Sequence, residues 1–227
     1  MTKEEIKDII GWDIVNWSRS LDYWEKQIQE QQKNNRCLEL GGRLGGLSLW
    51  LAMKGNQVIC SDLESPEKEA TAIHQKYECN SLITYQSIDA TNIPYENHFD
   101  IVCFKSILGG ISRNNHNELK KKTINEVYKS LKKDGILLFA ENLEASSLHS
   151  IFRKHFVKWG SEWNYLKIDE IDDIFESYKK VKYTTVGFWG AFGRKEWQRN
   201  LFGRIDRVFE KILLKKMRYI IIGIAQK

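Results

Sequence analysis

The sequence has few prolines and no long apolar run. These absences argue against a chain divided by flexible linkers and against a membrane-spanning protein. Only 2 of its 227 residues are proline, and no proline-rich or serine-rich linker divides the chain. No run reaches the roughly 18 apolar residues of a membrane-spanning helix; the longest, 136–140 and 219–225, have the length of strands. The length and composition indicate one globular domain, at most with an appended lid.

The N-terminus and the cysteines lack the patterns of export and of metal binding. The first residues, MTKEEIKDIIGWD, are acidic where a secretory leader is basic, and no apolar core follows them, so we expect a cytoplasmic protein. The four cysteines have no metal-ligand spacing, and three lie in apolar strand-like runs. They are predicted to be reduced core thiols, and no metal site is predicted.

Charge and tryptophan are unevenly distributed along the chain. Residues 1–150 hold 18 basic and 21 acidic side chains, whereas residues 151–227 hold 17 and 9, so the basic character belongs to the last third. Most of the eight tryptophans lie near the start or in this last third. Aromatic surfaces are therefore expected outside the central part of the fold.

The central part of the chain alternates between strand-like and helix-like patterns. Short apolar runs predict strands at 37–40, 57–61, 83–88, 100–104 and 136–140, and apolar residues at helical spacing predict helices at 45–54, 66–77 and 117–131. Strict alternation implies right-handed βαβ crossovers. The predicted fold class is α/β, with a doubly wound, mostly parallel sheet.

The two ends of the chain differ from this pattern. We predict an N-terminal helical lid at 1–35 and a main domain at 36–227, with a helical insertion at about 143–216 before a last strand at 218–225. Within the insertion, Trp197, Leu201, Ile205, Val208 and Ile212 follow a helical spacing, which indicates an amphipathic helix.

A glycine-rich turn follows the first predicted strand, in the segment Glu39-Leu40-Gly41-Gly42-Arg43-Leu44-Gly45-Gly46. Neither Gly41 nor Gly42 starts the Gly-x-Gly-x-x-Gly register of a dinucleotide site, so a nicotinamide cofactor is disfavoured. Asp62 stands at the end of the second predicted strand, where a carboxylate can accept both hydroxyls of a ribose. These features predict a nucleoside site with little phosphate.

The same residues, with three further segments, resemble a known family. The segments are Ser87-Ile88-Asp89-Ala90, Phe99-Asp100-Ile101-Val102 and Leu131-Lys132-Lys133-Asp134-Gly135-Ile136-Leu137-Leu138. Together they resemble the successive motifs of class I S-adenosylmethionine (SAM)-dependent methyltransferases, in order and at the family's spacings over about residues 36–142. The resemblance implies SAM as cofactor and the seven-stranded sheet of that class.

The resemblance also implies roles for single residues. Gly41 and Gly45 would let the backbone pass close to the methionyl part of SAM, with Glu39 beneath the loop. Asp62 would hold the ribose. Asp89 and the backbone N–H of Ala90 would contact the adenine. The family usually has a second glycine where this chain has Arg43, whose guanidinium would either pair with the methionine carboxylate or narrow the cavity.

The acceptor is expected over the ends of the fourth and fifth strands. The fourth strand lacks the Asp/Asn-Pro-Pro-Tyr/Phe motif of enzymes that methylate nucleic-acid bases, which argues against such substrates. The fifth ends in Glu141 and Asn142, and Glu141 is predicted to take a proton from a hydroxyl or to orient the acceptor. His149 is a second candidate base.

Further acceptor contacts are predicted from residue type. Lys105, after the fourth strand, is expected to bind a polar acceptor group or the protein's own carbonyl groups. Trp17 and Trp163 are expected either to line the acceptor side or to belong to the core of the lids. The basic helix at 194–216 is either a solvated face or a surface that recruits an anionic substrate or the inner face of a membrane.

These observations predict a SAM-dependent methyltransferase that acts on a small-molecule or saccharide acceptor, through a hydroxyl group. The wider sequence is similar to bacterial methyltransferases of polysaccharide or small-molecule biosynthesis. The alternatives are a SAM- or saccharide-binding protein without turnover and an RNA methyltransferase, which a pI near 8.9 keeps open.

Overall fold

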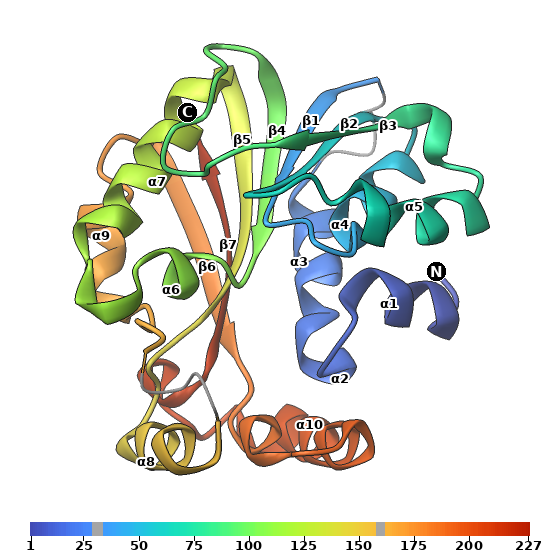
Figure 1. Ribbon diagram of the computed structural model, residues 1–227. Helices are drawn as coiled ribbons and strands as arrows, with labels where there is room; N and C mark the ends of the chain where they lie inside the picture. Colours follow the sequence, from blue (N-terminus) through green and yellow to red (C-terminus); the bar gives the residue numbers. More distant parts are fainter. Residues whose placement is uncertain (29–33, 158–161) are drawn as a thin grey trace.

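One mixed sheet of seven strands organises the chain (Figure 1). The structure is a computed structural model that describes residues 1–28, 34–157 and 162–227. The strands are β1 (Arg36–Leu40), β2 (Gln57–Asp62), β3 (Ile83–Ser87), β4 (Phe99–Lys105), β5 (Leu131–Asn142), β6 (Lys180–Val186) and β7 (Ile220–Gln226). Their order is β3-β2-β1-β4-β5-β7-β6, and all neighbours are parallel except for β7, which runs antiparallel between β5 and β6.

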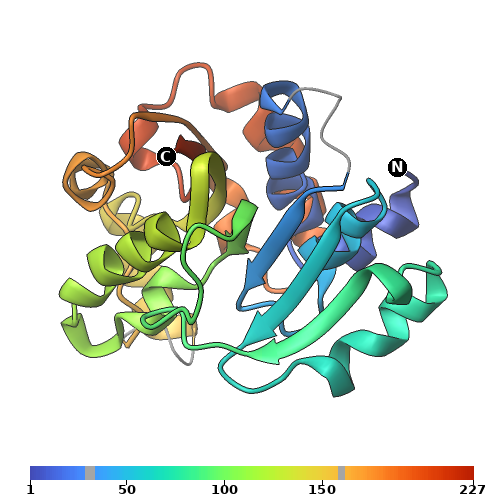
Figure 2. The ribbon, with the colours of Figure 1, turned by 90° about the horizontal axis from the view of Figure 1, so that it is seen from above.

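Helices cover both faces of this sheet, as Figure 2 shows in a view from above. They are α1 (Lys3–Ile10), α2 (Ile14–Trp17), α3 (Arg19–Gln27), α4 (Gly46–Ala52), α5 (Glu67–Lys76), α6 (Leu108–Ile111), α7 (Glu118–Ser130), α8 (Ser147–Phe156), α9 (Ile171–Ile174) and α10 (Glu196–Phe209). Short 3-10 turns link several of them, including one at Trp189–Phe192. The predicted doubly wound fold with a seven-stranded sheet is confirmed.

Two apolar cores lie on opposite faces of the sheet because side chains alternate along each strand. Cys37 and Cys103 pack with α1, α3 and α4 on one face, whereas Leu38 and Val102, their neighbours along β1 and β4, pack with α7 and α9 on the other. All four cysteines are buried and unpaired, as expected of core thiols. Strands covered on both faces explain the nearly continuous apolar runs of the sequence.

The N-terminal helices pack onto the domain. Trp24 of α3 is fully buried, and its Nε1 donates to the carbonyl oxygen of Gly223 in β7 at 3.0 Å. Ile9 and Ile10 of α1 are buried in the same core. The predicted lid at 1–35 therefore covers one sheet face with α3, and the segment between α1 and α2 reaches the carboxyl ends of the parallel strands.

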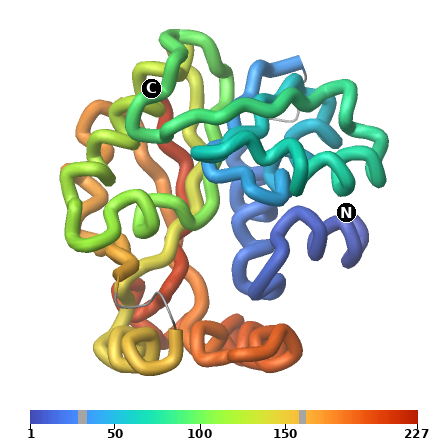
Figure 3. The backbone as a smooth tube through the Cα atoms, viewed as in Figure 1, coloured from blue at the N-terminus to red at the C-terminus, as the bar shows by residue number. Residues whose placement is uncertain are grey.

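β6 lies inside the segment 143–216, for which only helices are predicted. Within the described residues it pairs with β7 alone and is an edge strand. Residues 29–33 of the predicted lid and 158–161 of the predicted insertion lie outside the described residues. In the rest of the chain, no helix is long and apolar enough to cross a membrane. The helices α8 and α10 both lie beyond the carboxyl ends of the parallel strands (Figure 3).

The position of Trp24 predicts a large loss of stability on truncation. Trp24→Ala should lower the free energy of unfolding by about 3–5 kcal/mol, because it removes a large buried side chain. Trp197→Ala, at a side chain that is 63% exposed on α10, should change it by less than about 0.5 kcal/mol. Urea denaturation of the two variants checks this, and similar losses in both would contradict the described packing of α3.

Candidate active site

A buried carboxylate supports the glycine-rich turn after β1. Glu39 accepts hydrogen bonds from the backbone N–H groups of Leu47 (3.2 Å) and Ser48 (2.8 Å) and from the Ser48 hydroxyl (2.5 Å). Burial raises the pKa of the Glu39 carboxyl to about 7, against the effect of these hydrogen bonds. Glu39 thus fixes the start of α4 relative to β1 and places the turn between them.

Two glycines in this turn adopt conformations that a side chain would obstruct. Gly41 has a φ of 66° and Gly45 a φ of 70°. A Cβ atom at Gly41 would lie 2.4 Å from Ile107 Cγ2, and one at Gly45 would lie 2.4 Å from His74 Nε2. His74, buried on α5, supports the turn from below, because its Nε2 lies 2.9 Å from the carbonyl oxygen of Gly45.

Arg43 occupies the position where the family usually has glycine. Its φ of 32° is in the left-handed region, which costs a side-chain-bearing residue roughly 1 kcal/mol or more. Its backbone N–H donates to Asp62 Oδ2 at 3.1 Å, which ties the turn to the end of β2. Asp62 also accepts a hydrogen bond from the backbone N–H of Leu63.

A cavity of about 470 Å³, the glycine-loop cavity, opens above this turn. Its volume is typical of sites for small molecules. It is lined by Asp8, Ile9, Ile10, Gly11, Trp12, Glu39, Gly41, Gly42, Arg43, Leu44, Gly46, Leu47, Lys105, Ser106, Arg113 and Trp163.

The residues predicted to hold adenosine lie further along the same edge. Asp62 ends β2, and Asp89 and Ala90 follow β3, so the sheet order places them beside the cavity in succession. Asp89 is exposed and accepts hydrogen bonds from the backbone and hydroxyl of Thr91. The narrow turn at Gly41 and the row of carboxylates fit an extended nucleoside with a methionyl tail.

Lys105 lies at the wall of the glycine-loop cavity, at the end of β4. Its ammonium donates to the carbonyl oxygen of Ile10 at 2.9 Å and lies 4.9 Å from the ring centroid of Trp12 and 5.2 Å from that of Trp17. Burial lowers the pKa of Lys105 to about 8. Lys105 thus attaches the N-terminal segment to the strand end.

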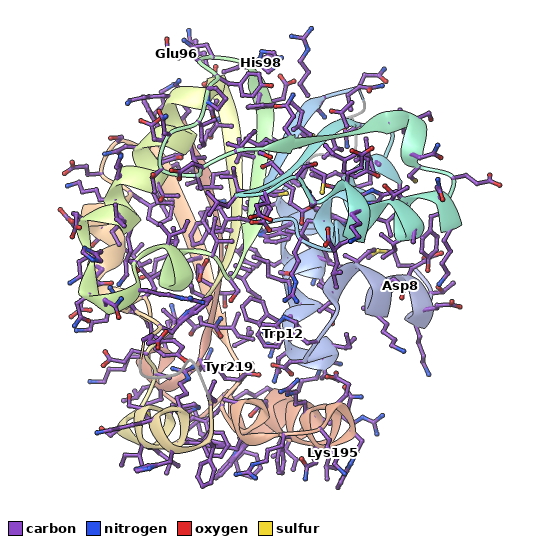
Figure 4. All side chains as sticks on the ribbon, in the orientation of Figure 1. Asp8, Trp12, Glu96, His98, Lys195 and Tyr219 are labelled. Carbon is purple, nitrogen blue, oxygen red and sulfur yellow. The ribbon has the colours of Figure 1, made fainter. Side chains whose placement is uncertain are left out.

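A second cavity, of about 840 Å³, lies between the end of β5 and the helices α8 and α10. We call it the arginine cavity. It is lined by Trp12, Asp13, Asn142, Phe152, Arg153, His155, Phe156, Val157, Tyr165, Gly190, Ala191, Gly193, Arg194, Arg199 and Tyr219. Figure 4 shows Trp12 and Tyr219 between α10 and the sheet.

The two cavities meet at the ends of β4 and β5. Trp12 lines both of them. Ser106 lines the glycine-loop cavity and Asn142 the arginine cavity, and Asn142 Nδ2 donates to Ser106 Oγ at 2.6 Å. A molecule in one cavity therefore lies next to a molecule in the other.

The two predicted bases lie behind the cavity walls. Glu141 is fully buried, and its carboxylate accepts hydrogen bonds from the backbone N–H groups of Ile107 (2.5 Å) and Leu108 (2.8 Å). His149 is 1% exposed, with Nε2 2.9 Å from the carbonyl oxygen of Phe188 and Nδ1 2.8 Å from Ser146 Oγ. Neither lines either cavity, and their placement favours the support of nearby turns over proton transfer.

The two predicted tryptophans differ in position. Trp17 is fully buried in the same core cluster as Trp24 and lines neither cavity. Trp163 lines the glycine-loop cavity and packs against Gly109 and Gly110, where Cβ atoms would lie within 3 Å of its ring. Of the two tryptophans, only Trp163 therefore borders a cavity.

Several cavity residues were not predicted from the sequence. Asp13, Arg153, Arg199 and Tyr219 line the arginine cavity, but they come from four separate parts of the chain and share no motif. The clustering of tryptophans near the start gave a partial signal, since Trp12 is at the junction of the cavities. In the described part of the chain, no three His, Cys, Asp or Glu side chains are placed to hold a metal ion.

Comparisons with known proteins agree with this geometry. Residues 38–139 match the family model described as a methyltransferase domain. No curated protein matches the chain by sequence. Phosphoethanolamine N-methyltransferase 2 of Haemonchus contortus, in complex with phosphomonomethylethanolamine and S-adenosylhomocysteine, superposes with a TM-score of 0.65 at 17% identity, over 93% of this chain and 52% of that chain. The chain thus spans about half the length of that enzyme.

Two further solved structures share the fold. YcgJ of Bacillus subtilis superposes with a TM-score of 0.62 at 15% identity, over 92% of this chain and 98% of that chain. The [4+2]-cyclase SpnF gives a TM-score of 0.62 at 15% identity, over 92% of this chain and 80% of that chain.

The fold, the glycine turn and the family match together define the class. Residues 38–139 match a methyltransferase domain, and the seven-stranded sheet has the fold of class I methyltransferases. The predicted family resemblance is confirmed by the domain match and by the fold.

The placement of His149 predicts a pH-dependent stability. Burial lowers its pKa from 6.5 to about 4, so folding favours the neutral ring. The stability that His149 contributes is present above pH 6.5 and is lost as the pH falls through 4, by about 3 kcal/mol in total. His149→Phe should flatten this part of the pH profile of the free energy of unfolding, whereas His155→Phe, at an exposed position of α8, should not. An unchanged profile in His149→Phe would contradict the burial of a neutral ring.

Proposed function

We propose that the protein transfers the methyl group of SAM to a small-molecule or saccharide acceptor. The observation that carries this proposal is the contact between the two cavities at the ends of β4 and β5. SAM would occupy the glycine-loop cavity and the adjoining edge of the sheet, and the acceptor would occupy the arginine cavity. When bound, SAM supplies an electrophilic methyl group on a sulfonium.

The cofactor half of the site follows from the residues around the glycine turn. Gly41 and Gly45 would let the backbone approach the methionyl part, Glu39 would lie near its ammonium group, and Arg43 would pair with its carboxylate. Asp62 would bind the ribose, and Asp89 and Ala90 the adenine. Arg43 lines the cavity, which supports the pairing role over an obstruction of the site.

The acceptor half needs alignment more than elaborate acid–base chemistry, because methyl transfer is an in-line displacement. Asn142, held by Ser106, is placed to orient a polar group of the acceptor at the junction of the cavities. Lys105 and Trp163 border the cofactor side of this junction. We assign Glu141 a positioning role, since its hydrogen bonds from the backbone of Ile107 and Leu108 hold the turn between β4 and α6.

A SAM- or saccharide-binding protein without turnover and an RNA methyltransferase are the competing functions. The fold alone does not separate them from a catalyst of small-molecule methylation, and a cyclase shares it. The second cavity next to the cofactor site favours turnover over cofactor binding alone. Its mixed aromatic and polar lining is typical of sites for small molecules.

Labelled SAM tests the proposed function. The protein should bind SAM in calorimetry and transfer labelled methyl to the small-molecule or glycan fraction of a cell extract. Asp62→Ala should weaken SAM binding roughly ten- to a hundredfold, because a hydrogen bond to a charged group contributes about 1.5–3 kcal/mol. Glu64→Ala, at an exposed carboxylate two residues away, is the matched control.

Each contrary result has a distinct meaning. SAM binding without any transfer of label would favour the binding protein. Label found in RNA alone would favour the RNA methyltransferase. A loss of SAM affinity in Glu64→Ala as large as that in Asp62→Ala would remove the assignment of Asp62 to the ribose.

We further propose that α10 contacts an anionic membrane surface. The helix has its predicted amphipathic pattern but ends at Phe209, short of the predicted residue 216. Its apolar side faces solvent: Trp197 is 63% and Val208 69% exposed, and Ile212, just beyond the helix, is 77% exposed. Exposed basic side chains, Arg204, Arg207, Lys211, Lys215 and Lys216, accompany them. Apolar and basic groups on one exposed surface are typical of helices that lie at the interface of anionic bilayers.

Vesicle binding tests this contact. The protein should cosediment with vesicles that contain phosphatidylglycerol but not with pure phosphatidylcholine, and salt should weaken binding. The double change Arg204→Gln and Arg207→Gln should lower the partition constant about 30-fold, at about 1 kcal/mol per basic residue. Lys68→Gln with Lys133→Gln, at exposed positions elsewhere, is the control. Concentration-dependent dimerisation in place of vesicle binding would assign the surface to a second copy of the chain.

A further inference from the structure

The arginine cavity has a chemical character that the methyltransferase fold does not require. Three of its lining residues are arginines, Arg153, Arg194 and Arg199, and Asp13 is its one acidic lining residue. From these groups we infer that the acceptor is a small anion, with a carboxylate or phosphate on the arginines and a nucleophilic N–H or O–H on the Asp13 carboxylate. This inference rests on the proposed methyl transfer and specifies its acceptor.

Asp13 does not cap the helix that follows it. It stands at the N-cap position of α2, where an aspartate ordinarily accepts a hydrogen bond from the first turn, but its side chain makes no capping bond. Its φ of 46° is in the left-handed region, which is strained for an aspartate. The backbone N–H groups of Asp13 and Ile14 both donate to Glu196, at 3.0 and 2.9 Å, and this attaches the strained loop to α10.

The two oxygens of the Asp13 carboxylate have different surroundings. Oδ2 accepts a hydrogen bond from the Tyr219 hydroxyl. Oδ1 is buried and has no hydrogen-bond partner among residues 1–28, 34–157 and 162–227. A buried carboxylate oxygen without a donor is costly, so the residue is poised for a donor that a ligand brings.

The ionisation of Asp13 suits a proton acceptor. Burial raises the pKa of its carboxyl to about 7, and Glu196 and Asp206 act in the same direction, whereas the Tyr219 hydrogen bond and Arg199 lower it. A general base is most effective when its pKa lies near the working pH. Asp13 also adjoins Trp12, the residue that both cavities share, so it lies close to the cofactor side.

The arginines form a cationic, aromatic wall around the remainder of the cavity. Arg153 is 7% exposed; its Nη1 donates to the carbonyl oxygens of Leu143 and Glu144, and its guanidinium lies 3.9 Å from the Tyr165 ring centroid. The Arg194 guanidinium lies 4.5 Å from the Phe156 ring centroid. The planar guanidinium group matches the geometry of a planar anion such as a carboxylate.

The proposed step balances as follows. A lone pair of the acceptor nitrogen or oxygen forms the new bond to the methyl carbon while the bond from that carbon to sulfur breaks, and the sulfur keeps the bonding electrons. The proton of the nucleophile passes to Asp13. The products are the methylated anion, S-adenosylhomocysteine and a protonated carboxyl that releases its proton to solvent.

The transfer of labelled methyl groups to a cell extract tests this inference separately from the proposed function. After incubation with labelled SAM, labelled small molecules should be retained on an anion-exchange resin. Asp13→Asn should lower kcat about 10²–10⁴-fold with unchanged SAM affinity, whereas Asp22→Asn, at an exposed site on α3, should change neither. Failure of SAM binding in the unaltered protein would refute the proposed function instead. Label only in the unretained neutral fraction, or full activity in Asp13→Asn, would overturn the inference.

Direct binding gives a second readout that does not depend on turnover or on the folding of Asp13→Asn. The anionic probes are 4-hydroxybenzoate, 4-aminobenzoate and phenyl phosphate, and the neutral probe is 4-hydroxybenzamide. In the presence of S-adenosylhomocysteine, at least one anionic probe should bind at least tenfold more tightly than the neutral probe. Arg194→Gln should remove this preference, and Arg36→Gln, at the exposed start of β1, should keep it. Equal binding of anionic and neutral probes, or no binding of any anion, would count against an anionic acceptor.

Discussion

The hydroxyl group of Tyr219 joins the walls of the arginine cavity. It donates to Asp13 and accepts from Asn16 Nδ2 at 2.9 Å, and Asn16 also donates to Asp206 Oδ2 at 3.0 Å. Asp206 in turn accepts from the backbone N–H of Gly190 at 3.0 Å. These buried hydrogen bonds connect the N-terminal segment, α10, the turn at Trp189–Phe192 and the start of β7. In a low dielectric such a network is strong when complete and costly when one member is lost.

This network explains why the N-terminal segment is a wall of the site and not a detachable cover. The α1–α2 segment contributes Trp12 to both cavities and Asp13 to one, and it is fixed by Lys105 from β4 and by Glu196 from α10. α10 is attached in the same polar manner, since its buried side chains include Asp206 but none of its large apolar residues. Hydrogen bonds therefore hold this helix in place, which leaves its apolar side free for a partner.

The sequence predicts the parts of the fold that local patterns determine. The five parallel strands follow from apolar runs, and the glycine turn follows from its motif, because both depend on neighbouring residues. β6 is an edge strand with alternating lysines, Lys180 and Lys182, and its only strand partner, β7, comes 34 or more residues later. Nothing local distinguishes it from the helical segments around it.

In the candidate site, too, the sequence predicts only those side-chain positions that depend on neighbouring residues. Glu39 is placed by the helix that immediately follows it, and its position beneath the turn was predictable. Glu141 contacts backbone groups of Ile107 and Leu108, more than 30 residues earlier, and this contact decides that its carboxylate supports a turn. Asp13 acquires its role from Tyr219, 206 residues away in the chain. Such roles arise from tertiary contacts that a single sequence does not display.

The charges of the arginine cavity bear on which acceptor can be bound close to SAM. Two unit charges 4 Å apart interact by about 4 kcal/mol at an effective dielectric constant of about 20. Arg199 pairs with Glu196 at 3.7 Å. A neutral saccharide in this cavity would leave Arg153 and Arg194, beside the sulfonium, without a carboxylate partner in the described part of the chain. An anionic acceptor adds the missing negative charge, and Asp13 then stabilises the positive charge that develops on the nucleophile as the methyl group arrives. The same lining disfavours a cationic acceptor without an acidic group, since its charge would add to that of the arginines and of the sulfonium.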